Sequence, residues 1–473
     1  MIKRSEGCIV NGLVARDALV FCLDEHRDNC RRLDELEKYI KNEPPIVDRI
    51  RTTGKANNRL IHNYARYIVK MASGYLIGSP VAYSDEKQQS ALEAVMEQYR
   101  AFDAQAVDME LAKAASKFGR AAEILYADKE ANPRCAAIDP RSAFVVYDDT
   151  VEKKPLFGVH FSAITKNDGT RKGYRVNVYT QGWVQRYEVP EFYALLDAAP
   201  IEEKKHYFGS IPINEYWNDE DERGDFEWVT SLIDALNVLQ SDRVNDKEQF
   251  VNALLVLLGC RLEADASGRT PSQQIMEDRI LQLPSAGERP ADAKYLIQTM
   301  DETQVEVLKK SIKEEIHKLS MVPDLTDEKF AGNASGVAMG YKLFGFTQLI
   351  KSKERYFREA LRWRLRMIAT FMGRLASPSL DADKVQISFS RSLPVNESEI
   401  ATMVMQLRDL VPDELLLKQI PFVEDPKAAL ELLRAQEEES AKRQADAFGM
   451  PMNTPTGEPP EDEEGDEDGK PAA

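Results

Sequence analysis

The sequence is poor in the residues that build disulfide frameworks, metal centres and membrane spans. Only five cysteines and five histidines occur in 473 residues. An odd number of scattered cysteines favours free thiols in a reducing compartment over a disulfide framework. The longest aliphatic run, residues 253–258, is far shorter than the roughly 20 residues that span a bilayer. We therefore expect a soluble protein made in a cytoplasm, without a secretory signal after Met1.

Catalytic motifs are also missing. The chain has no Gly-x-Ser-x-Gly, no His-Glu-x-x-His and no pair of Cys-x-x-Cys motifs. Gly336 and Gly340 lack the Gly-Lys-Ser/Thr ending of a P-loop, which would bring a lysine and Mg²⁺ to a nucleotide. These absences count against an enzyme. We expect no catalytic residue, no bound metal and no cofactor.

Candidate metal ligands do occur in two acidic groups. Asp381 and Asp383 stand two residues apart beside a predicted strand, where they could hold a cation. The loop Asp219–Glu222 is wholly acidic, but it lacks the glycine and the alternating ligands of a calcium loop. Because aspartate is a common loop residue, the sequence favours solvated loops at both places over metal sites.

A third candidate metal site lies at the start of a charged helix predicted over residues 24–41. Cys22, His26 and Cys30 recur every four residues and so share one helix face. A zinc site would need Cys8 as the fourth ligand, and structural zinc sites usually use closer ligand pairs. We interpret the three residues as one face of a partly buried helix.

The formal net charge of −17 argues against a protein whose whole surface binds nucleic acid. It leaves room for a locally basic channel, since the distribution of charge matters more than its sum. The last part of the chain, residues 446–473, is rich in Pro, Gly, Asp and Glu and has almost nothing to bury. We predict a disordered acidic tail there.

Hydrophobic periodicity indicates an α+β fold that is mostly helical. Helices are predicted over 56–78, 87–99, 103–118, 225–258, 301–321, 338–373, 396–411 and 426–445. Strands are predicted at 124–127, 144–147, 157–161, 174–179, 183–189, 279–283, 294–298 and 385–390. Asp168-Gly169 tolerates positive φ and predicts a hairpin in a meandering antiparallel sheet. In the helices over 225–258 and 301–321, we expect Trp228, Leu254, Leu308 and Leu319 on buried stripes.

The segment Gly332–Gly373 organises the rest of the chain. A Gly- and Asn-rich loop leads into a helix of about 30 residues, on the order of 45 Å long. Its apolar face consists of Leu343, Phe346, Ile350, Phe357, Leu361, Leu365, Ile368 and Met372. A second face, roughly 100° away, carries the five residues that we call the basic stripe: Lys351, Arg355, Arg358, Arg362 and Arg366.

Two stretches of sequence carry a family resemblance. One runs from Asn58 to Val69 and continues through Gly74–Val81, and the other runs from Ser335 to Gly345 and leads into Lys353-Glu354-Arg355. With the order of elements between them, over roughly residues 50–440, the chain resembles the portal (head-to-tail connector) proteins of tailed bacteriophages, in particular the siphophage branch. These motifs are structural, so they indicate a family but no active site.

The resemblance implies a homo-oligomeric ring, usually a dodecamer, at one vertex of a phage capsid. Its central channel would admit double-stranded DNA during packaging and release it during ejection. The other expected partners are the terminase motor, the head–tail adaptor and the major capsid and scaffolding proteins, with no membrane. The expected location is the virion, with assembly in the host cytoplasm.

The same resemblance implies a division of the chain into portal regions. These are an N-terminal arm and helix (1–50), wing (51–240), stem helix (241–260), clip (261–300), second stem helix (301–321), tunnel loop (322–337), long tunnel helix (338–373), wing return strand (374–395), crown helices (396–445) and acidic tail (446–473).

The expected tunnel loop contains the residues that we place closest to DNA. Lys329 is the main candidate for transient phosphate contact, and Asn333 and Ser335 are further candidates. An ordinary solvated lysine that pairs with Asp327 or Glu328 explains Lys329 equally well. A conduit must not bind DNA tightly, because each phosphate contact adds affinity, so an acidic chain with few basic loop residues suits a channel.

The basic stripe has two interpretations. It could line the channel and face DNA, or it could pair with carboxylates of a neighbouring subunit, where the guanidinium fork suits interfacial ion pairs. We favour the subunit interface, because an apolar face lies beside the stripe and a ring needs large heterologous contacts. Two rival functions remain open: a metal-dependent nucleic-acid-processing enzyme, and a monomeric helical interaction protein.

Overall fold

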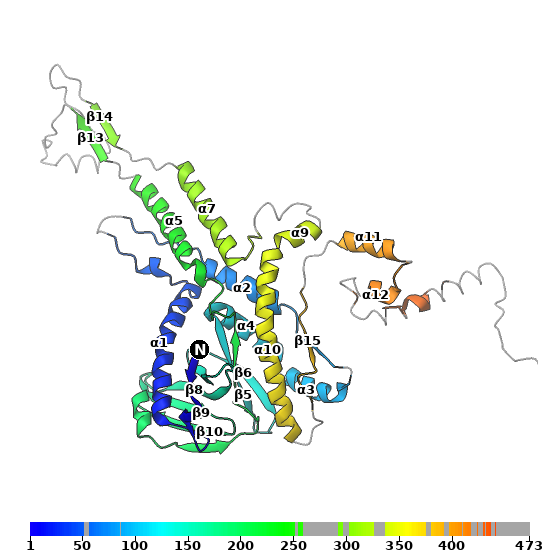
Figure 1. Cartoon of the computed structure of the whole chain (residues 1–473). Coiled ribbons are helices and arrows are strands. Elements are labelled where there is room, and N and C mark those ends of the chain that lie inside the picture. The colour runs from blue at the N-terminus through cyan, green and yellow to red at the C-terminus, as the bar shows by residue number, and fades with distance from the viewer. Residues whose placement is uncertain are drawn as a thin grey trace, which may run out of the picture. The chain divides into compact units, whose positions relative to one another are not determined.

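The computed structural model divides the chain into two units, Met1–Leu393 and Pro394–Ala473. The residues that it describes are 1–51, 56–85, 87–250, 254–258, 292–296, 302–325, 336–374, 380–391, 397–408, 410–417, 423, 429–430, 432–436 and 440. The first unit contains the sheets, the main core and the long helix (Figure 1). The second unit contributes the described helices α11 (Glu397–Leu407) and α12 (Asp413–Leu417).

Eight described helices shape the first unit. They are α1 (Arg16–Ile40), α2 (Tyr64–Ile77), α3 (Gln89–Ala101), α4 (Ala104–Phe118), α5 (Thr230–Phe250), α7 (Glu302–Ser320), α9 (Gly336–Lys342) and α10 (Phe344–Arg374). Its strands are β1 (Ile2–Arg4), β2 (Ile9–Val10), β3 (Leu13–Val14), β4 (Ala82–Ser84), β5 (Arg120–Ala127), β6 (Pro133–Ile138), β7 (Ala143–Asp148), β8 (Pro155–Thr165), β9 (Arg171–Tyr179), β10 (Trp183–Val189), β11 (Glu202–Lys205), β12 (Ile213–Trp217), β13 (Leu254–Leu258), β14 (Asp292–Leu296) and β15 (Gln386–Ser388).

The strands form two main sheets in place of the single predicted meander. The larger sheet has the order β1-β7-β8-β9-β10-β11, in which β1 is parallel to β7 and the other pairs are antiparallel. The β8–β9 hairpin turns at Gly169, whose φ of 79° confirms the Asp-Gly prediction. The first predicted strand, residues 124–127, lies in β5 and belongs to the smaller sheet, β12-β5-β6, and not to the predicted meander. Strand β15 pairs separately with β4.

The main core lies where α10 meets the other helices and β12. All eight residues of the predicted apolar face of α10 are buried, from Leu343 at 7% exposure to Met372 at 8%. Seven of them, all except Leu343, join two hydrophobic clusters, one with α1, α2, α4 and α5 and one with α3 and α4. The predicted helix is therefore present and amphipathic, although a turn at Leu343 separates α9 from α10. Burial of this face is the main source of stability for a helix of this length.

The helix predicted over 56–78 begins only at Tyr64, and residues 56–63 have no helical structure. Three fully buried polar side chains of α5 hold this non-helical segment: Asn237, Ser241 and Asn245. They accept hydrogen bonds from the backbone N–H groups of His62 (2.7 Å), Leu60 (2.9 Å) and Asn58 (2.6 Å), respectively. We call this set the polar ladder. Asn63 then caps α2 by accepting from the N–H of Arg66 at 2.9 Å.

The helix predicted over 225–258 is also shorter than expected, which corrects the first stem helix. Helix α5 ends at Phe250, and Leu254–Leu258 is a strand, β13, that pairs with Asp292–Leu296. A short apolar run fits a strand as well as a helix, so periodicity alone could not decide. Trp228 precedes α5 in a 3₁₀ turn and is 63% exposed, not buried.

Helix α7 confirms the helix predicted over 301–321 in extent but not in burial. Of its predicted buried edge, Ile316 is buried, whereas Leu308 and Leu319 are 50% and 55% exposed. Helices α5 and α7 lie side by side and extend away from the sheets (Figure 1). In the described part of the chain, no helix has the length and apolar character needed to cross a membrane.

Candidate functional site

The residues of the basic stripe on α10 differ in their exposure and in their ion pairs. Lys351 and Arg355 are exposed, and neither forms an ion pair within the described residues. Arg358 is already engaged inside the chain: it pairs with Glu354 and donates to the carbonyl of Ile387 at 3.2 Å. The exposed beginning of the stripe is therefore the part that is available to another molecule.

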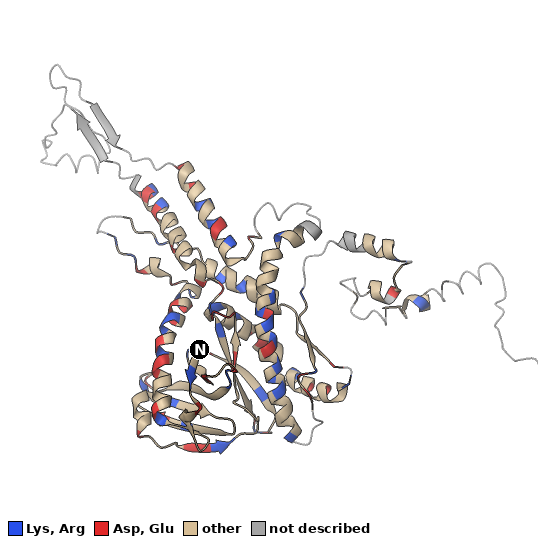
Figure 2. Ribbon diagram, in the orientation of Figure 1, with Lys and Arg blue, Asp and Glu red and all other residues tan. Residues whose placement is uncertain are grey.

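The rest of the stripe is less available. Arg362 is partly buried, and its Nε has no hydrogen-bond partner within the described residues. Arg366 pairs with Asp383, and both side chains are more than half exposed. Figure 2 shows how basic and acidic residues alternate along α10 and along the α5 and α7 helices. The stripe is thus no continuous positive surface in this chain.

Helix α10 also carries two buried cations, neither of which belongs to the basic stripe. Arg364 is fully buried and lies between Asp108 of α4 and Glu123 of β5, with N–O distances of 2.6 Å to each carboxylate. Burial raises the pKa of Asp108 even though the Arg364 charge acts in the opposite direction. Arg364 lies three residues after Leu361, at a position that the helical period assigns to the core, and this misplaced charge was the available signal.

The second buried cation is Lys353, which is 3% exposed. Its ammonium group pairs with Asp225, and the same carboxylate accepts from Ser116 and, at 2.7 Å, from the side-chain amide of Asn218. Buried pairs with further hydrogen bonds are weak evidence for added stability, but removing one partner leaves an uncompensated charge. Lys353 and Arg364 therefore fix α10 to the body of the chain at two positions along its length.

The paired helices α5 and α7 are joined by charge. Arg243 of α5 lies 2.8 Å from both Glu302 and Glu306 of α7, and Lys247 lies 3.0 Å from Glu302. Because water screens these groups, the pairs add little to stability. Their effect is to set the pairing of the two helices, which leaves the apolar residues of α7 on the outside.

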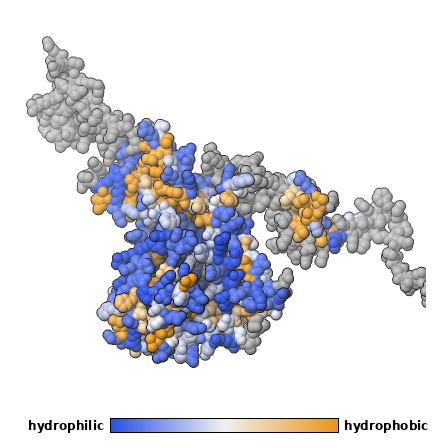
Figure 3. Space-filling model, viewed as in Figure 1, coloured by the Kyte–Doolittle hydropathy of each residue, from blue (hydrophilic) through white to orange (hydrophobic). Residues whose placement is uncertain are grey.

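Apolar side chains are exposed along α7 and around the start of α10. Their exposed fractions are 65% for Val307, 50% for Leu308, 55% for Leu319, 53% for Met321, 79% for Tyr341 and 62% for Phe344. Apolar patches over the α5–α7 pair are also visible on the molecular surface (Figure 3). Gathered exposed apolar surface of this kind indicates an interaction site.

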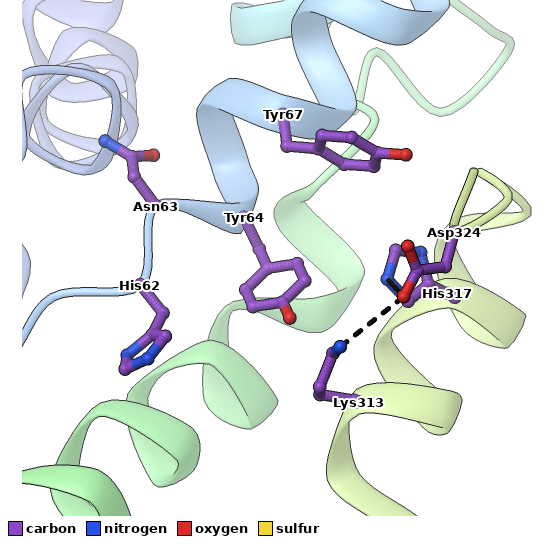
Figure 4. A pocket seen from close by; sticks show the side chains of 7 residues that line it. All are labelled: His62, Asn63, Tyr64, Tyr67, Lys313, His317 and Asp324. Carbon is purple, nitrogen blue, oxygen red and sulfur yellow. Dashed lines mark ion pairs between the residues drawn. The ribbon is translucent and has the colours of Figure 1, made fainter. Parts of the chain in front are cut away.

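A polar cavity of about 300 Å³ lies at the end of α7, next to the start of α2 (Figure 4). The imidazole of His317 donates from Nδ1 to the carbonyl of Val322 at 2.9 Å, which places its Nε2 towards Asp324 at 3.6 Å. Lys313 is 3.4 Å from the same carboxylate, and the hydroxyl of Tyr67 donates to the carbonyl of Pro323 at 2.7 Å. These contacts anchor the chain as it leaves α7 towards the expected tunnel loop.

The predicted DNA-proximal residues Lys329, Asn333 and Ser335 lie outside the described residues. The predicted acidic candidates have other partners. Asp381 pairs with Lys384 at 2.8 Å, and Asp383 pairs with Arg366. Among the residues that the structure describes, no three His, Cys, Asp or Glu side chains are grouped so as to hold a metal ion.

The face formed by Cys22, His26 and Cys30 is buried, as predicted: Cys22 and His26 are fully buried, and Cys30 is partly buried. The imidazole of His26 contacts the carbonyl of Arg141 at 3.0 Å and stacks on the ring of Phe144 with 4.5 Å between centroids. Burial lowers the pKa of His26 to about 3, so the ring is neutral at pH 7. This face packs the helix against the larger sheet.

Residues 19–443 match the model of a family described as phage portal protein, SPP1 Gp6-like. The chain belongs to this family. The portal protein of Bacillus phage SPP1 is 24% identical over 399 residues, which cover 81% of this chain and 76% of that protein. The portal protein of Clostridium phage phiCD119 is 21% identical over 426 residues, or 83% of this chain and 88% of that protein.

Solved structures of gene transfer agent particles resemble the chain more distantly. The neck of an empty gene transfer agent particle matches with a TM-score of 0.44 and 13% identity, over 75% of this chain and 89% of that one. The neck of the native particle, computed with C12 symmetry, matches with a TM-score of 0.42 and 13% identity, over 76% and 89%. The family match confirms the predicted α+β portal fold. The chain functions as a phage portal protein, a structural component of the virion.

Proposed function

We propose that this portal protein assembles as a closed homo-oligomeric ring, a dodecamer at one capsid vertex, whose channel passes double-stranded DNA during packaging and ejection. The observation that carries the proposal is the exposed apolar surface of α7, which a single chain leaves in water. Heterologous contacts between copies close into a ring when the rotation between neighbours closes. The same contacts would bury Leu308 and Leu319 between adjacent pairs of α5 and α7.

The regional assignment rests on the resemblance to portal proteins. Residues 51–240 act as the wing, the part of α5 after residue 240 together with α7 as the stem, and residues 261–300 as the clip that contacts the terminase motor and the head–tail adaptor. Residues 322–337 form the tunnel loop, with Lys329, Asn333 and Ser335 nearest to DNA, and residues 396–445 form the crown. The ring assembles in the host cytoplasm, together with the major capsid and scaffolding proteins.

The test is the size of the purified protein, measured by light scattering after gel filtration and by negative-stain imaging. We expect rings with a central hole. Leu308→Glu combined with Leu319→Glu should abolish the rings, because two charges would be buried between copies. Lys310→Glu changes the charge by the same two units at an exposed position that the helical period places on a different side of α7 from Leu308 and Leu319, and it should leave the rings intact. A wild-type particle of monomer mass would contradict the proposal and support a monomeric interaction protein.

The basic stripe is tested on the same particles. We propose that Lys351 and Arg355 pair with carboxylates of the neighbouring copy, since these two cations have no ion pair within the described residues. Lys351→Glu with Arg355→Glu should therefore impair ring formation. Arg358→Glu with Arg362→Glu is a less clean test, because Arg358 already pairs with Glu354. Normal rings that fail only in DNA packaging would show instead that the stripe faces the channel.

We also propose that the chain has no enzymatic activity. Support comes from Asp381 and Asp383, the strongest metal candidates in the sequence, because each pairs with a basic side chain. Incubation of the purified protein with DNA and Mg²⁺ or Mn²⁺ should leave the DNA intact. Metal-dependent cleavage that is lost in Asp383→Ala would establish a nuclease.

A further inference from the structure

A second cavity, of about 310 Å³, lies between β7, β12 and the middle of α10. Its position is fixed from both sides. Asn214 of β12 donates to the carbonyl of Ala360 on α10 at 3.0 Å, and Tyr147 of β7 donates to Glu215 of β12 at 2.9 Å. The cavity is therefore framed by regular elements that hydrogen bonds hold together.

The walls of this cavity are unusually aromatic. Tyr147, Trp217, Tyr356 and Trp363 all line it, and all four are partly buried. The rings of Tyr147 and Trp217 meet edge to face, with 6.0 Å between centroids and 74° between planes. Aromatic faces of Trp and Tyr attract cations within about 6 Å of the ring centre.

The charged groups that line the cavity are mostly acidic. Glu215 is part of the wall, and its carboxylate accepts from the hydroxyl of Tyr147 and, at 3.3 Å, from the N–H of Val145. No basic side chain pairs with Glu215 within the described residues. The charge of Arg120 lowers the pKa of Glu215, but desolvation outweighs it and the pKa is raised. Glu215 is partly buried. A desolvated carboxylate without an ion partner is costly, and a cation in the cavity would offset that cost.

Three exposed side chains complete the lining: Glu152 and Glu359, which are acidic, and Lys153. Glu152 pairs with Lys154, whereas Glu359 has no ion pair within the described residues. Lys153 is the only basic side chain among the lining residues, and it too forms no ion pair in the part of the chain that the structure describes. Its charge opposes the binding of a cation at the entrance.

We propose that this cavity binds an organic cation, an alkylammonium or alkylguanidinium group, with its charged end on Glu215 and its alkyl chain against the aromatic walls. A free polyamine has this chemistry, and so does a lysine or arginine side chain of an adjacent copy. The proposal concerns a site on the body of the chain and does not depend on the proposed ring or on the exposed face of α7.

The test uses the full-length chain in its unassembled form and agmatine as the probe, followed by calorimetry and by tryptophan fluorescence. Two of the four tryptophans of the chain, Trp217 and Trp363, line the cavity, so binding should change the emission. Glu215→Gln should weaken binding at least about tenfold, since a charge-assisted hydrogen bond is lost. Glu359→Gln should weaken it by a smaller factor, and Lys153→Ala should tighten it.

The controls separate charge from shape and from folding. Glu130→Gln removes one exposed carboxylate outside the cavity and should leave agmatine affinity unchanged. 1-Pentanol, a neutral ligand of similar length, should not bind. If Glu215→Gln does not fold, the exposed substitutions at Glu359 and Lys153 still carry the test. Unchanged affinity in Glu215→Gln, equal binding of 1-pentanol, or no binding of agmatine to the wild-type chain would overturn the proposal.

The source of the cation follows from a comparison of the unassembled chain with the assembled particle. Agmatine that binds both forms indicates a site for a free cation. Agmatine that binds only the unassembled chain indicates that a lysine or arginine of an adjacent copy fills the cavity on assembly. Both results support the cavity as a cation site, and they identify its occupant.

Discussion

The body of this portal protein and its α5–α7 pair place charged and apolar side chains in opposite ways. In the body, the charges of Lys353 and Arg364 are buried with carboxylates around α10. On α7, the apolar side chains Val307 and Leu308 are exposed, while the charges are in water. The buried charges of the body find their partners within one chain, whereas α7 leaves apolar side chains in water, which we propose that a second copy covers. Substitutions in the body should therefore change the free energy of unfolding, and substitutions on α7 should change assembly.

The largest effect on folding is expected from Arg364→Met. The substitution leaves Asp108 and Glu123 buried without a cation, which should lower the free energy of unfolding by about 3–5 kcal/mol. Urea denaturation of the unassembled chain measures it. Adding Asp108→Asn and Glu123→Gln to Arg364→Met should recover part of the loss, because the uncompensated charges are removed. A loss below about 1 kcal/mol for Arg364→Met would show that the body tolerates this charge as a surface does.

An intermediate effect is expected from acid, through His26. Its pKa is about 3 in the folded chain and near 6.5 when unfolded, so the unfolded state binds more protons between these values. The stabilising contribution is complete above about pH 6.5 and is lost as the pH falls, by about 2 kcal/mol at pH 5. His26→Gln should lose less stability than wild type between pH 7.5 and 5. Parallel pH profiles of the two proteins would rule out His26 as the source.

A smaller effect is expected from Arg366→Met, the matched substitution on the exposed face of the same helix. Arg366 and Asp383 are more than half exposed, and pairs of this kind contribute about 0–1 kcal/mol. The difference between Arg364→Met and Arg366→Met in the same denaturation experiment measures how much burial adds to an ion pair. Equal losses would contradict the contrast between the two faces of α10.

The smallest effect on folding is expected from Val307→Ser. This side chain is 65% exposed in the single chain, so the free energy of unfolding of the unassembled protein should change by no more than about 0.5 kcal/mol. Assembly, followed by light scattering over a dilution series, should weaken. If Val307→Ser destabilises the unassembled chain instead, α7 is part of the body's core and the comparison fails.

Much of the fold follows from local patterns in the sequence. The apolar face of α10 and the hairpin at Gly169 could be predicted because a long helical period and an Asp-Gly turn are strong signals. The ion pair of Arg364 could not, since its partner Asp108 is 256 residues away in the chain. The late start of α2 depends likewise on Asn237 and its neighbours in α5, at least 175 residues later.

The candidate site could likewise be predicted from the sequence only in part. The periodicity placed Lys351 and Arg355 correctly on an exposed face, because a helical stripe needs only local sequence. It could not show that Arg358 is held by Glu354 and the carbonyl of Ile387, since the latter depends on a return of the chain after α10. Nor could it show that Leu308 is exposed, because an apolar stripe looks the same whether its partner is the same chain or another copy.

The spacing of donors and acceptors limits how many hydrogen bonds the polar ladder can contain. Side chains four residues apart on a helix repeat every 6.0 Å or so, whereas alternate N–H groups of an extended chain repeat about every 6.6 Å. The spacing of the acceptors on α5 and the spacing of the backbone donors are nearly equal, and the difference of roughly 0.6 Å per hydrogen bond adds up along the contact. Over the three hydrogen bonds to Asn237, Ser241 and Asn245, this difference fits within the range of hydrogen-bond lengths. In a longer polar ladder, further donors and acceptors would no longer lie within hydrogen-bond distance of each other. A short contact with α5 can therefore position the first residue of α2.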